Sequence, residues 1–488
     1  MNSNQENIEL LLQKREWQTF ECKRAAVQPR KILEAIDAFA NTEGGIVVLG
    51  LEDPEKADGP ARLLGISEHP DNVSEVLKLI DKEIEPPLQA TKIVELPIQN
   101  GAQQGDKLLV IIVHKSNDIH SLKNGDTFIR NGSQNVKIGS AQIIRLKYEK
   151  GVTKYESEPS KMKDWELIDK ELFDRFKQET GSRNGNDWQL LKDNGLALKT
   201  AEDFEFTQGG LLLFAKNPAV ALGAKCSIKI SHYHGVDRNF TGEPNFVRRP
   251  FSIEGPLYHQ ITKTVDYFRE TVRSSPPKLS GATFKPTLLV PEWVFQEAIA
   301  NAVIHRNYSV QDDIHVRFFD DRIEIESPGT YPGHITPSNI RQERFARNPL
   351  ILRTLNRFSD APNLDHGEGV DRMFAVMLEN NLYEPIYWPP STRQNSVTVS
   401  LLNTQRIAFW DTVNQYCEKH TYITNETARK ITGINDTLKM SKLLSTWVKQ
   451  GLLEKTGEKR HTVYSKSSAN KLENLFSLSI DNKNKNSK

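Results

Sequence analysis

The sequence contains little cysteine: three residues in 488, at Cys22, Cys226 and Cys417, lie far apart. None belongs to a CxxC pair, so the sequence predicts neither a disulfide framework nor a cysteine-based zinc site. It also lacks any apolar run approaching about 18 residues, which excludes a membrane-spanning helix. The start, MNSNQENIEL, does not have the basic and then apolar pattern of a signal peptide. We therefore expect a cytoplasmic protein with no membrane partner.

The chain has almost no net charge. Lys and Arg number 64 against 63 Asp and Glu, a formal charge of +1. No global positive field attracts nucleic acid, so any surface that binds it must be a local patch. Hydrophobic residues make up 37% of the chain, which is enough for real cores. At about 150 residues per domain, the length predicts roughly three domains.

The apolar patterns predict mixed α/β domains. Ile32, Ile36, Phe39 and Ala40 share one face of a helix that ends before Gly44 and Gly45. Further strands are expected at residues 46–51, 108–113, 128–132, 314–319 and 322–326, and further helices at residues 257–268, 291–305 and after 369. Residues 147–164 are polar and predict a linker.

Carboxylates gather around an N-terminal strand. Glu16, Glu21 and Lys23 surround it, and Asp53 follows the next strand. Carboxylates beside a lysine suit a divalent metal and a phosphodiester together. Their odd spacing puts Glu16 and Glu21 on opposite faces of a regular strand, so convergence requires Glu16 to lie in the preceding turn or at a bulge. The alternative is a set of solvated charges with a salt bridge at the strand edge.

Three segments here carry a resemblance: ExxxxFECK, AFANTEGGIVVLGLED and FIRNGS. Over about residues 8–140 the chain resembles the AlbA-like domain of Schlafen proteins and many bacterial relatives. In members with ribonuclease activity the resemblance implies catalytic, metal-binding roles for Glu16, Glu21 and Asp53, with Glu52 as a substitute for Asp53. In many bacterial relatives the domain is regarded as a DNA-binding module.

Local charge favours nucleic-acid contact independently. Between residues 14 and 31 there are six basic residues and only two acidic ones, which gives +4. Such a patch neutralises phosphates by counterion release. Lys23 and Arg24 are the candidate contacts within it. Arg130 is a phosphate contact or, alternatively, part of a structural salt bridge.

A second set of candidate residues lies between residues 285 and 402. Glu297 and Asn301 share one face of the predicted helix at residues 291–305, where a carboxylate can polarise water and an amide oxygen can coordinate Mg²⁺. Gly329 follows a strand. Gly367 and Gly369 precede a helix, whose exposed N–H groups suit a phosphate.

Three segments in this order, EAIANAVIHRNYS, DRIEIESPG and HGEGVDRM, resemble the N-box and the two glycine boxes of the GHKL ATPase fold. The resemblance implies ATP and Mg²⁺, or Mn²⁺, as cofactors, Glu297 as general base and Asn301 as metal ligand. Gly329, Gly367 and Gly369 would bind the nucleotide, and the segment between residues 330 and 366 would act as a lid. Ser327 occupies the place of the aspartate that recognises adenine in this fold.

Basic and polar residues that follow these segments allow two interpretations. His305, Arg306 and Asn307 either reach phosphates or complement the C-terminal dipole of the helix. Arg347 and Asn348, in the expected lid, also allow both a functional and a structural interpretation.

The C-terminal part, residues 405–466, predicts three helices and a hairpin typical of a winged helix, in which Thr424 can cap the second helix and Gly451 ends the third. Lys439 and Lys442 on the third helix are candidate DNA contacts, since residues 439–460 carry +4. A winged helix serves protein contact or dimerisation equally well.

We therefore expect an α/β (α+β) multidomain protein. Its predicted parts are an AlbA-like nucleic-acid-binding domain at residues 1–150, a middle α/β domain at 151–284, a GHKL-like ATP-binding α/β sandwich at 285–402, a winged helix at 403–470 and a polar tail at 471–488.

The predicted function is an ATP-responsive protein that binds DNA or RNA, as a regulator or as an effector of genome or anti-phage defence, because this requires only binding. The alternatives are a metal-dependent nuclease of Schlafen type gated by ATP, and a catalytically inert assembly scaffold. ATPase activity, a homo-oligomeric state and partner proteins all stay open.

Overall fold

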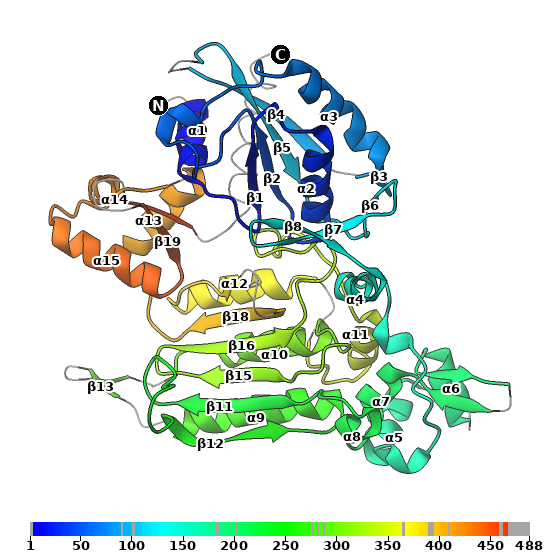
Figure 1. The fold of residues 1–488 in the computed structure, drawn as a ribbon. Helices are drawn as coiled ribbons and strands as arrows, with labels where there is room; N and C mark the ends of the chain where they lie inside the picture. Colours follow the sequence, from blue (N-terminus) through cyan, green and yellow to red (C-terminus); the bar gives the residue numbers. More distant parts are fainter. Residues whose placement is uncertain are drawn as a thin grey trace, which may run out of the picture. The chain divides into compact units, whose positions relative to one another are not determined.

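The computed structural model describes residues 3–88, 91–99, 103–181, 186–201, 203–274, 278–280, 283–285, 288–363, 367–388, 395–407, 409–420, 422–457 and 462–466. The chain divides into two compact units, one made of residues 1–147 and 407–488 and the other of residues 148–406 (Figure 1). In the described part of the chain, no helix is long and apolar enough to cross a membrane.

The N-terminal domain is built on a four-stranded sheet in the order β1-β2-β5-β4. Its strands are β1 (Phe20–Lys23), β2 (Gly45–Leu49), β4 (Thr91–Pro97) and β5 (Lys107–Val113). Strand β1 runs parallel to β2, and helix α2 connects them, as a parallel crossover requires. The other pairs are antiparallel. Around the sheet lie α1 (Ser3–Gln13), α2 (Pro29–Asn41), α3 (Pro70–Glu83), the β3–β6 pair (Ile84–Glu85, Ser121–Leu122) and the β7–β8 hairpin (Thr127–Asn131, Gln134–Ile138). Helix α4 (Ser140–Lys150) follows the hairpin along the chain.

Strand β2 is buried on both faces, which explains its continuous apolar run. Val47 and Leu49 pack into the core that α2 and α3 cover. Ile46 and Val48 face the opposite way, into a core that includes Leu11 of α1. The predicted helix at residues 32–40 and the predicted strands at residues 46–51, 108–113 and 128–132 are thus confirmed.

The second unit is organised around a six-stranded mixed sheet in the order β12-β11-β15-β16-β18-β17. Its strands are β11 (Ile228–Tyr233), β12 (Phe246–Ile253), β15 (Ile314–Phe318), β16 (Arg322–Pro328), β17 (Ile386–Tyr387) and β18 (Ser396–Leu402). Helices α9 (Leu257–Ser274), α10 (Glu292–Ile304) and α12 (Gly369–Glu379) lie alongside one another against it (Figure 1). Helix α10 lies between the other two, so most of its residues are buried.

Smaller elements complete this unit. They are α5 (Lys170–Glu179), α6 (Asp187–Asp193), α7 (Gln208–Phe214), α8 (Pro218–Leu222), α11 (Pro349–Leu355) and the β9–β10 (Ala197–Lys199, Phe204–Phe206) and β13–β14 (Lys278–Ser280, Thr283–Lys285) pairs.

The linker expected at residues 147–164 begins where the two units divide, after residue 147, but part of it is packed into the second unit. Helix α4 continues to Lys150, and Glu156 is buried. Its carboxylate accepts hydrogen bonds from the backbone N–H groups of Leu350 and Ile351, both at 2.8 Å, in the first turn of α11. The polar composition that suggested a linker therefore includes a buried carboxyl group that accepts hydrogen bonds from the first turn of a helix.

The C-terminal part forms α13 (Phe409–Lys419), α14 (Asn425–Thr432), α15 (Thr437–Lys449) and the antiparallel β19–β20 pair (Leu453–Thr456, Val463–Lys466). Thr424 accepts a hydrogen bond from the N–H of Thr427 and so caps α14. Gly451 ends the last helix with φ +76°. The three predicted helices and the hairpin are confirmed, and the winged-helix assignment stays a prediction.

Candidate functional site

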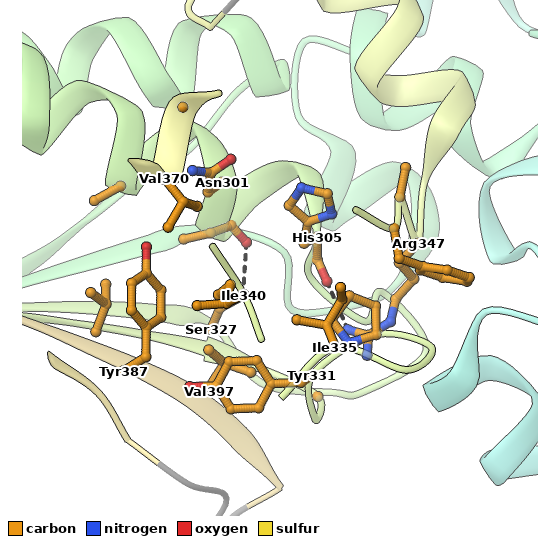
Figure 2. Close-up of a pocket in the computed structure, with 18 of the residues that line it drawn as sticks. Asn301, His305, Ser327, Tyr331, Ile335, Ile340, Arg347, Val370, Tyr387 and Val397 are labelled. Atoms are coloured by element: carbon orange, nitrogen blue, oxygen red, sulfur yellow. Dashed lines mark hydrogen bonds between the residues drawn. The ribbon is translucent and has the colours of Figure 1, made fainter. Parts of the chain in front are cut away.

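The second unit contains a cavity of about 330 Å³, within the size range of small-molecule sites. One wall is α10, and the facing wall comes from strands β16, β17 and β18. The segment from Gly329 to Arg347 and the start of α12 close it. Figure 2 shows Asn301 and Tyr387 towards one end of this cavity and His305 and Arg347 towards the other.

Glu297 and Asn301 point into the cavity from α10, as their spacing predicted. The amide nitrogen of Asn301 donates to Oε1 of Glu297 at 3.1 Å, which leaves the amide oxygen of Asn301 as an acceptor. Burial raises the pKa of Glu297 to about 7, although the hydrogen bond from Asn301 opposes that rise. Near neutral pH this carboxyl group exchanges its proton readily, as a general base must.

Gly369 lies directly against Glu297 at the start of α12. A Cβ atom at this position would come within 2.0 Å of Oε1 of Glu297, so only glycine allows this approach. The carboxylate, the amide of Asn301 and the first turn of α12 therefore meet at one point. Gly367, two residues earlier, has φ +65° and passes so close to Arg344 that a Cβ would lie 2.4 Å from its Nε.

Arg344 is a lining residue that the sequence analysis missed. It is exposed, and the described residues include no ion-pair partner for it. Its contact with Gly367 brings a guanidinium beside the glycine pair expected to bind phosphate. No motif contains Arg344, and its place in the cavity depends on how residues 330–347 fold back over α10.

Polar groups around Ser327 and towards the His305 end of the cavity are engaged in structural contacts. The hydroxyl of Ser327 donates to the carbonyl of Ala302 at 2.7 Å (Figure 2). Burial, together with Arg347, lowers the pKa of His305 to about 4, so its imidazole is neutral. Gly329 has φ +101°, and a Cβ there would meet the Cβ of Asn307 at 2.5 Å. Gly329 thus lines the cavity and allows two segments to approach closely.

Arg347 and Asn348 hold the end of α10 rather than a ligand. Arg347 donates to the carbonyls of His305 at 2.7 Å and Thr330 at 2.5 Å. Asn348 donates to those of Ile304 and Arg306, both at 2.8 Å. Arg306 is also buried and donates to backbone carbonyls, including that of Lys225 at 2.6 Å. For Arg347 and Asn348 the structure favours the helix-terminus interpretation. The acceptors of Arg306 lie outside α10, so Arg306 holds neighbouring segments together instead.

The expected lid at residues 330–366 is packed against the cavity over its described part. Tyr331 is buried, and its hydroxyl donates to the carbonyl of Trp388 at 2.7 Å. Residues 364–366, which include His366 of the second glycine box, lie outside the described residues.

In the N-terminal domain, Glu16 and Glu21 do converge. The Nζ of Lys23 lies 2.7 Å from Oε1 of Glu16 and 2.8 Å from Oε1 of Glu21. Glu16 precedes β1, in the irregular segment before the turn at residues 18–19, so the two carboxylates converge although their spacing along the chain is odd. Burial alone would lower the pKa of Lys23, but its contacts with Glu21 and Glu16 outweigh burial and raise that pKa.

Arg130 does not reach a nucleic acid. Its side chain is fully buried and forms an ion pair with Glu21. It also donates to the carbonyls of Trp17 at 2.9 Å and Phe20 at 3.2 Å. The prediction of Arg130 as a phosphate contact is therefore corrected in favour of the structural salt bridge, which sequence reasoning had left open.

The structure does not add Asp53 to Glu16 and Glu21 as a third metal ligand. Among the described residues, no group of three or more His, Cys, Asp or Glu side chains could hold a metal ion. Asp53 instead accepts a hydrogen bond from the N–H of Glu55 at 2.9 Å. A three-carboxylate metal centre thus stays a prediction that this geometry does not support.

Trp17 is a second residue that the sequence analysis did not select as functional. Its side chain is 59% exposed, although Arg130 holds its backbone, and its ring lies beside Gly132. An exposed indole on a firmly held turn, next to Glu16, offers a stacking surface for a base. Sequence alone cannot separate such a tryptophan from a core residue.

The basic patch at residues 14–31 is less positive in the folded domain than in the sequence. Arg24 forms ion pairs with Glu68 and Glu52, and Lys23 forms ion pairs with Glu16 and Glu21. Arg30 and Lys31 pair with Glu34, and Arg30 also with Asp126. Most of these acids come from distant parts of the chain. On α15, Lys439 and Lys442 are exposed.

Comparison with known proteins identifies two regions. Residues 16–139 match the family described as "Schlafen, AlbA_2", and residues 311–401 match that described as "Putative ATP-dependent DNA helicase recG C-terminal". The second match contains Gly329, Gly367 and Gly369 but begins after α10. No curated protein matches the chain significantly.

One solved structure, the DIP2311 protein from Corynebacterium diphtheriae, is 17% identical over 94% of each chain, with a TM-score of 0.41. The family matches agree with the architecture expected from the sequence motifs. The chain therefore combines a Schlafen AlbA_2 domain at residues 16–139 with a domain of the recG C-terminal family at residues 311–401.

Proposed function

We propose that the protein binds nucleic acid and that a nucleoside triphosphate in the cavity of the second unit controls this binding. The observation that carries the proposal is the buried carboxyl of Glu297, which lies between the amide of Asn301 and Gly369 at the start of a helix. The two matched family descriptions, one from Schlafen proteins and one from a DNA helicase, support the link to nucleic acid. Such a protein would serve as a DNA-binding regulator or as an effector of genome defence.

The residues of the cavity fit ATP with Mg²⁺. The amide oxygen of Asn301 would be the one protein ligand, which suits Mg²⁺ because this ion keeps several waters and binds phosphate oxygens. Mg²⁺ would neutralise charge on the phosphates. The N–H groups at the start of α12 face the same point, and Arg344 would neutralise the outer phosphates. Glu297 would accept a proton from the attacking water if the nucleotide is hydrolysed.

Titration of ATP tests the proposal. The dissociation constant for Mg-ATP is measured by calorimetry with and without saturating DNA or RNA. Because coupling is reciprocal, nucleic acid must change ATP affinity by the same factor by which ATP changes nucleic-acid affinity, typically about 5–150-fold. Arg344→Gln should weaken ATP binding, whereas Arg341→Gln, which removes a guanidinium paired with Asp371, should not. Identical dissociation constants for Mg-ATP with and without nucleic acid would refute control of nucleic-acid binding by ATP.

A metal-dependent nuclease is the second candidate. The convergence of Glu16 and Glu21 on Lys23 favours it, because two carboxylates and an ammonium can hold a metal and a phosphodiester. Its test compares wild-type protein with Glu16→Gln on RNA, tRNA and single- and double-stranded DNA in Mn²⁺. Glu16 suits this test better than Glu21, whose other oxygen is bound to buried Arg130. Equal cleavage, or none, in every reaction eliminates the nuclease.

A further inference from the structure

The outer edge of the six-stranded sheet carries arginines that have no acidic partner. Strand β12 is at this edge, and Arg248 and Arg249 on it are exposed, as is Arg238 in the preceding connection. Among the described residues, none of the three forms an ion pair. Inner arginines of the same sheet do: Arg317 pairs with Glu326 at 2.6 Å. The three guanidinium groups are therefore left without an ion pair, although Asp237 and Glu243 in the same connection reduce the net charge of residues 234–249.

Aromatic rings accompany these arginines. Phe240 is 85% exposed and Phe251 37% exposed. The guanidinium carbon of Arg238 lies 5.7 Å from the Phe240 ring centroid, and that of Arg248 lies 5.0 Å from the Phe251 centroid. Arg248 also lies 4.2 Å from the ring centroid of Tyr267, which orients it. Exposed phenyl rings beside guanidinium groups are the combination that binds unpaired bases and their phosphates.

Backbone pairing with another strand is disfavoured at the same edge. Pro250 lies in the middle of β12 and has no N–H to donate, and the register with β11 is irregular between Ile230 and His232. Proline, a bulge and positive charge are the features that prevent sheet edges from pairing. The edge thus offers side chains rather than a continuous row of backbone groups.

We propose that this edge surface, made of Arg238, Phe240, Arg248, Arg249 and Phe251, binds single-stranded nucleic acid. The arginines contact phosphates, and the phenyl rings stack on bases. This inference rests on the proposed function for its ligand class, but it places a nucleic-acid contact outside the AlbA_2 domain, in the unit that contains the nucleotide cavity.

The test measures anisotropy of a labelled 20-nucleotide single-stranded DNA, and of its duplex, with the full chain between 50 and 200 mM NaCl. Arg248→Gln/Arg249→Gln should lower the slope of log affinity against log salt by about 1.4, at about 0.7 per phosphate. Phe240→Ala should weaken single-strand binding about tenfold with little change in slope. Because Phe240 is so exposed, its loss leaves folding intact. The control Lys192→Gln/Arg357→Gln removes two exposed positive charges elsewhere in the unit and should have no effect.

The outcomes separate this inference from the proposed function. If wild-type protein binds neither DNA, nor RNA of the same sequence, both fail. If it binds but the edge variants behave like wild type, only the edge surface is refuted. Two results would overturn the single-strand assignment and indicate a general polyanion surface. One is an equal loss of affinity for single strand and duplex in the arginine variant, with no effect of Phe240→Ala. The other is displacement of the DNA by polyglutamate.

Discussion

Arg130 stabilises the turn before β1 from inside the N-terminal domain. Arg130→Gln would remove the fully buried partner of Glu21, which keeps only its ion pair with Lys23. It would also remove the guanidinium donors to the carbonyls of Trp17 and Phe20, so we expect a loss of about 3 kcal/mol in unfolding free energy. Thermal unfolding measures this loss. The exposed Arg24→Gln should change stability little. A variant that keeps wild-type stability but loses nucleic-acid affinity would restore Arg130 as a phosphate contact.

Glu297 predicts a pH dependence of stability. Its folded pKa of about 7 lies above the ordinary value near 4.3, so the folded state holds a proton that the unfolded state has lost. The resulting stabilisation is complete below about pH 4.3 and disappears as pH rises through about 7. Glu297→Gln removes this dependence. The free energy of unfolding of the variant, relative to that of wild type, should therefore rise by roughly 2 kcal/mol between pH 5.5 and pH 8.

The measurement compares melting temperatures of wild type and Glu297→Gln at both pH values. Burial also raises the pKa of Glu156 to about 7, but Glu156 is present in both proteins and cancels in the difference. A constant difference across pH would contradict the raised pKa of Glu297. Hydrolysis of ATP, where it occurs, should be lost in the variant while binding persists.

At the scale of elements, the start of α12 is positioned by glycine. Gly369→Ala would place a methyl group against Oε1 of Glu297 and force the carboxylate or the helix to move. We expect a loss of about 1–3 kcal/mol in stability and weaker ATP binding. The matched control is Gly139→Ala, before α4, where a Cβ meets nothing within 4 Å. Calorimetric titration measures the ATP affinity of both variants. Wild-type affinity in Gly369→Ala would show that α12 does not form part of the site.

Elements were predicted well where one apolar periodicity dominates. The apolar pattern alone predicts helix α2, strand β5 and helix α15. In each of them the apolar residues of the pattern are the ones that the fold buries. The segment at residues 147–164 was predicted poorly, because Glu156 is buried through hydrogen bonds to residues nearly 200 positions away. Composition cannot distinguish such an anion from a solvated one.

For the whole molecule, near-zero net charge means that nucleic-acid affinity depends on a few local contacts. If α15 contacts duplex DNA, Lys439→Gln/Lys442→Gln should lower the slope of log affinity against log salt by about 1.8, at about 0.9 per phosphate. Binding of ATP should not change. Lys419→Gln/Lys430→Gln removes the same charge from α13 and α14 and serves as control. If both double variants lower the slope equally, α15 has no special role.

The sequence by itself indicated the two regions that match known families and five of the residues that line the cavity. Glu297 and Asn301 share a helix face because four residues make about one turn, and Gly329, Gly367 and Gly369 occur in short recognisable segments. Only the tertiary structure decided what charged residues do. Arg130 and Arg347 are buried among carbonyls, Arg24 pairs with Glu68, and Arg344 and Arg248 keep exposed guanidinium groups. The physical reason is that a charge is neutralised by whatever group folding brings within a few ångströms, and those groups are distant in the chain.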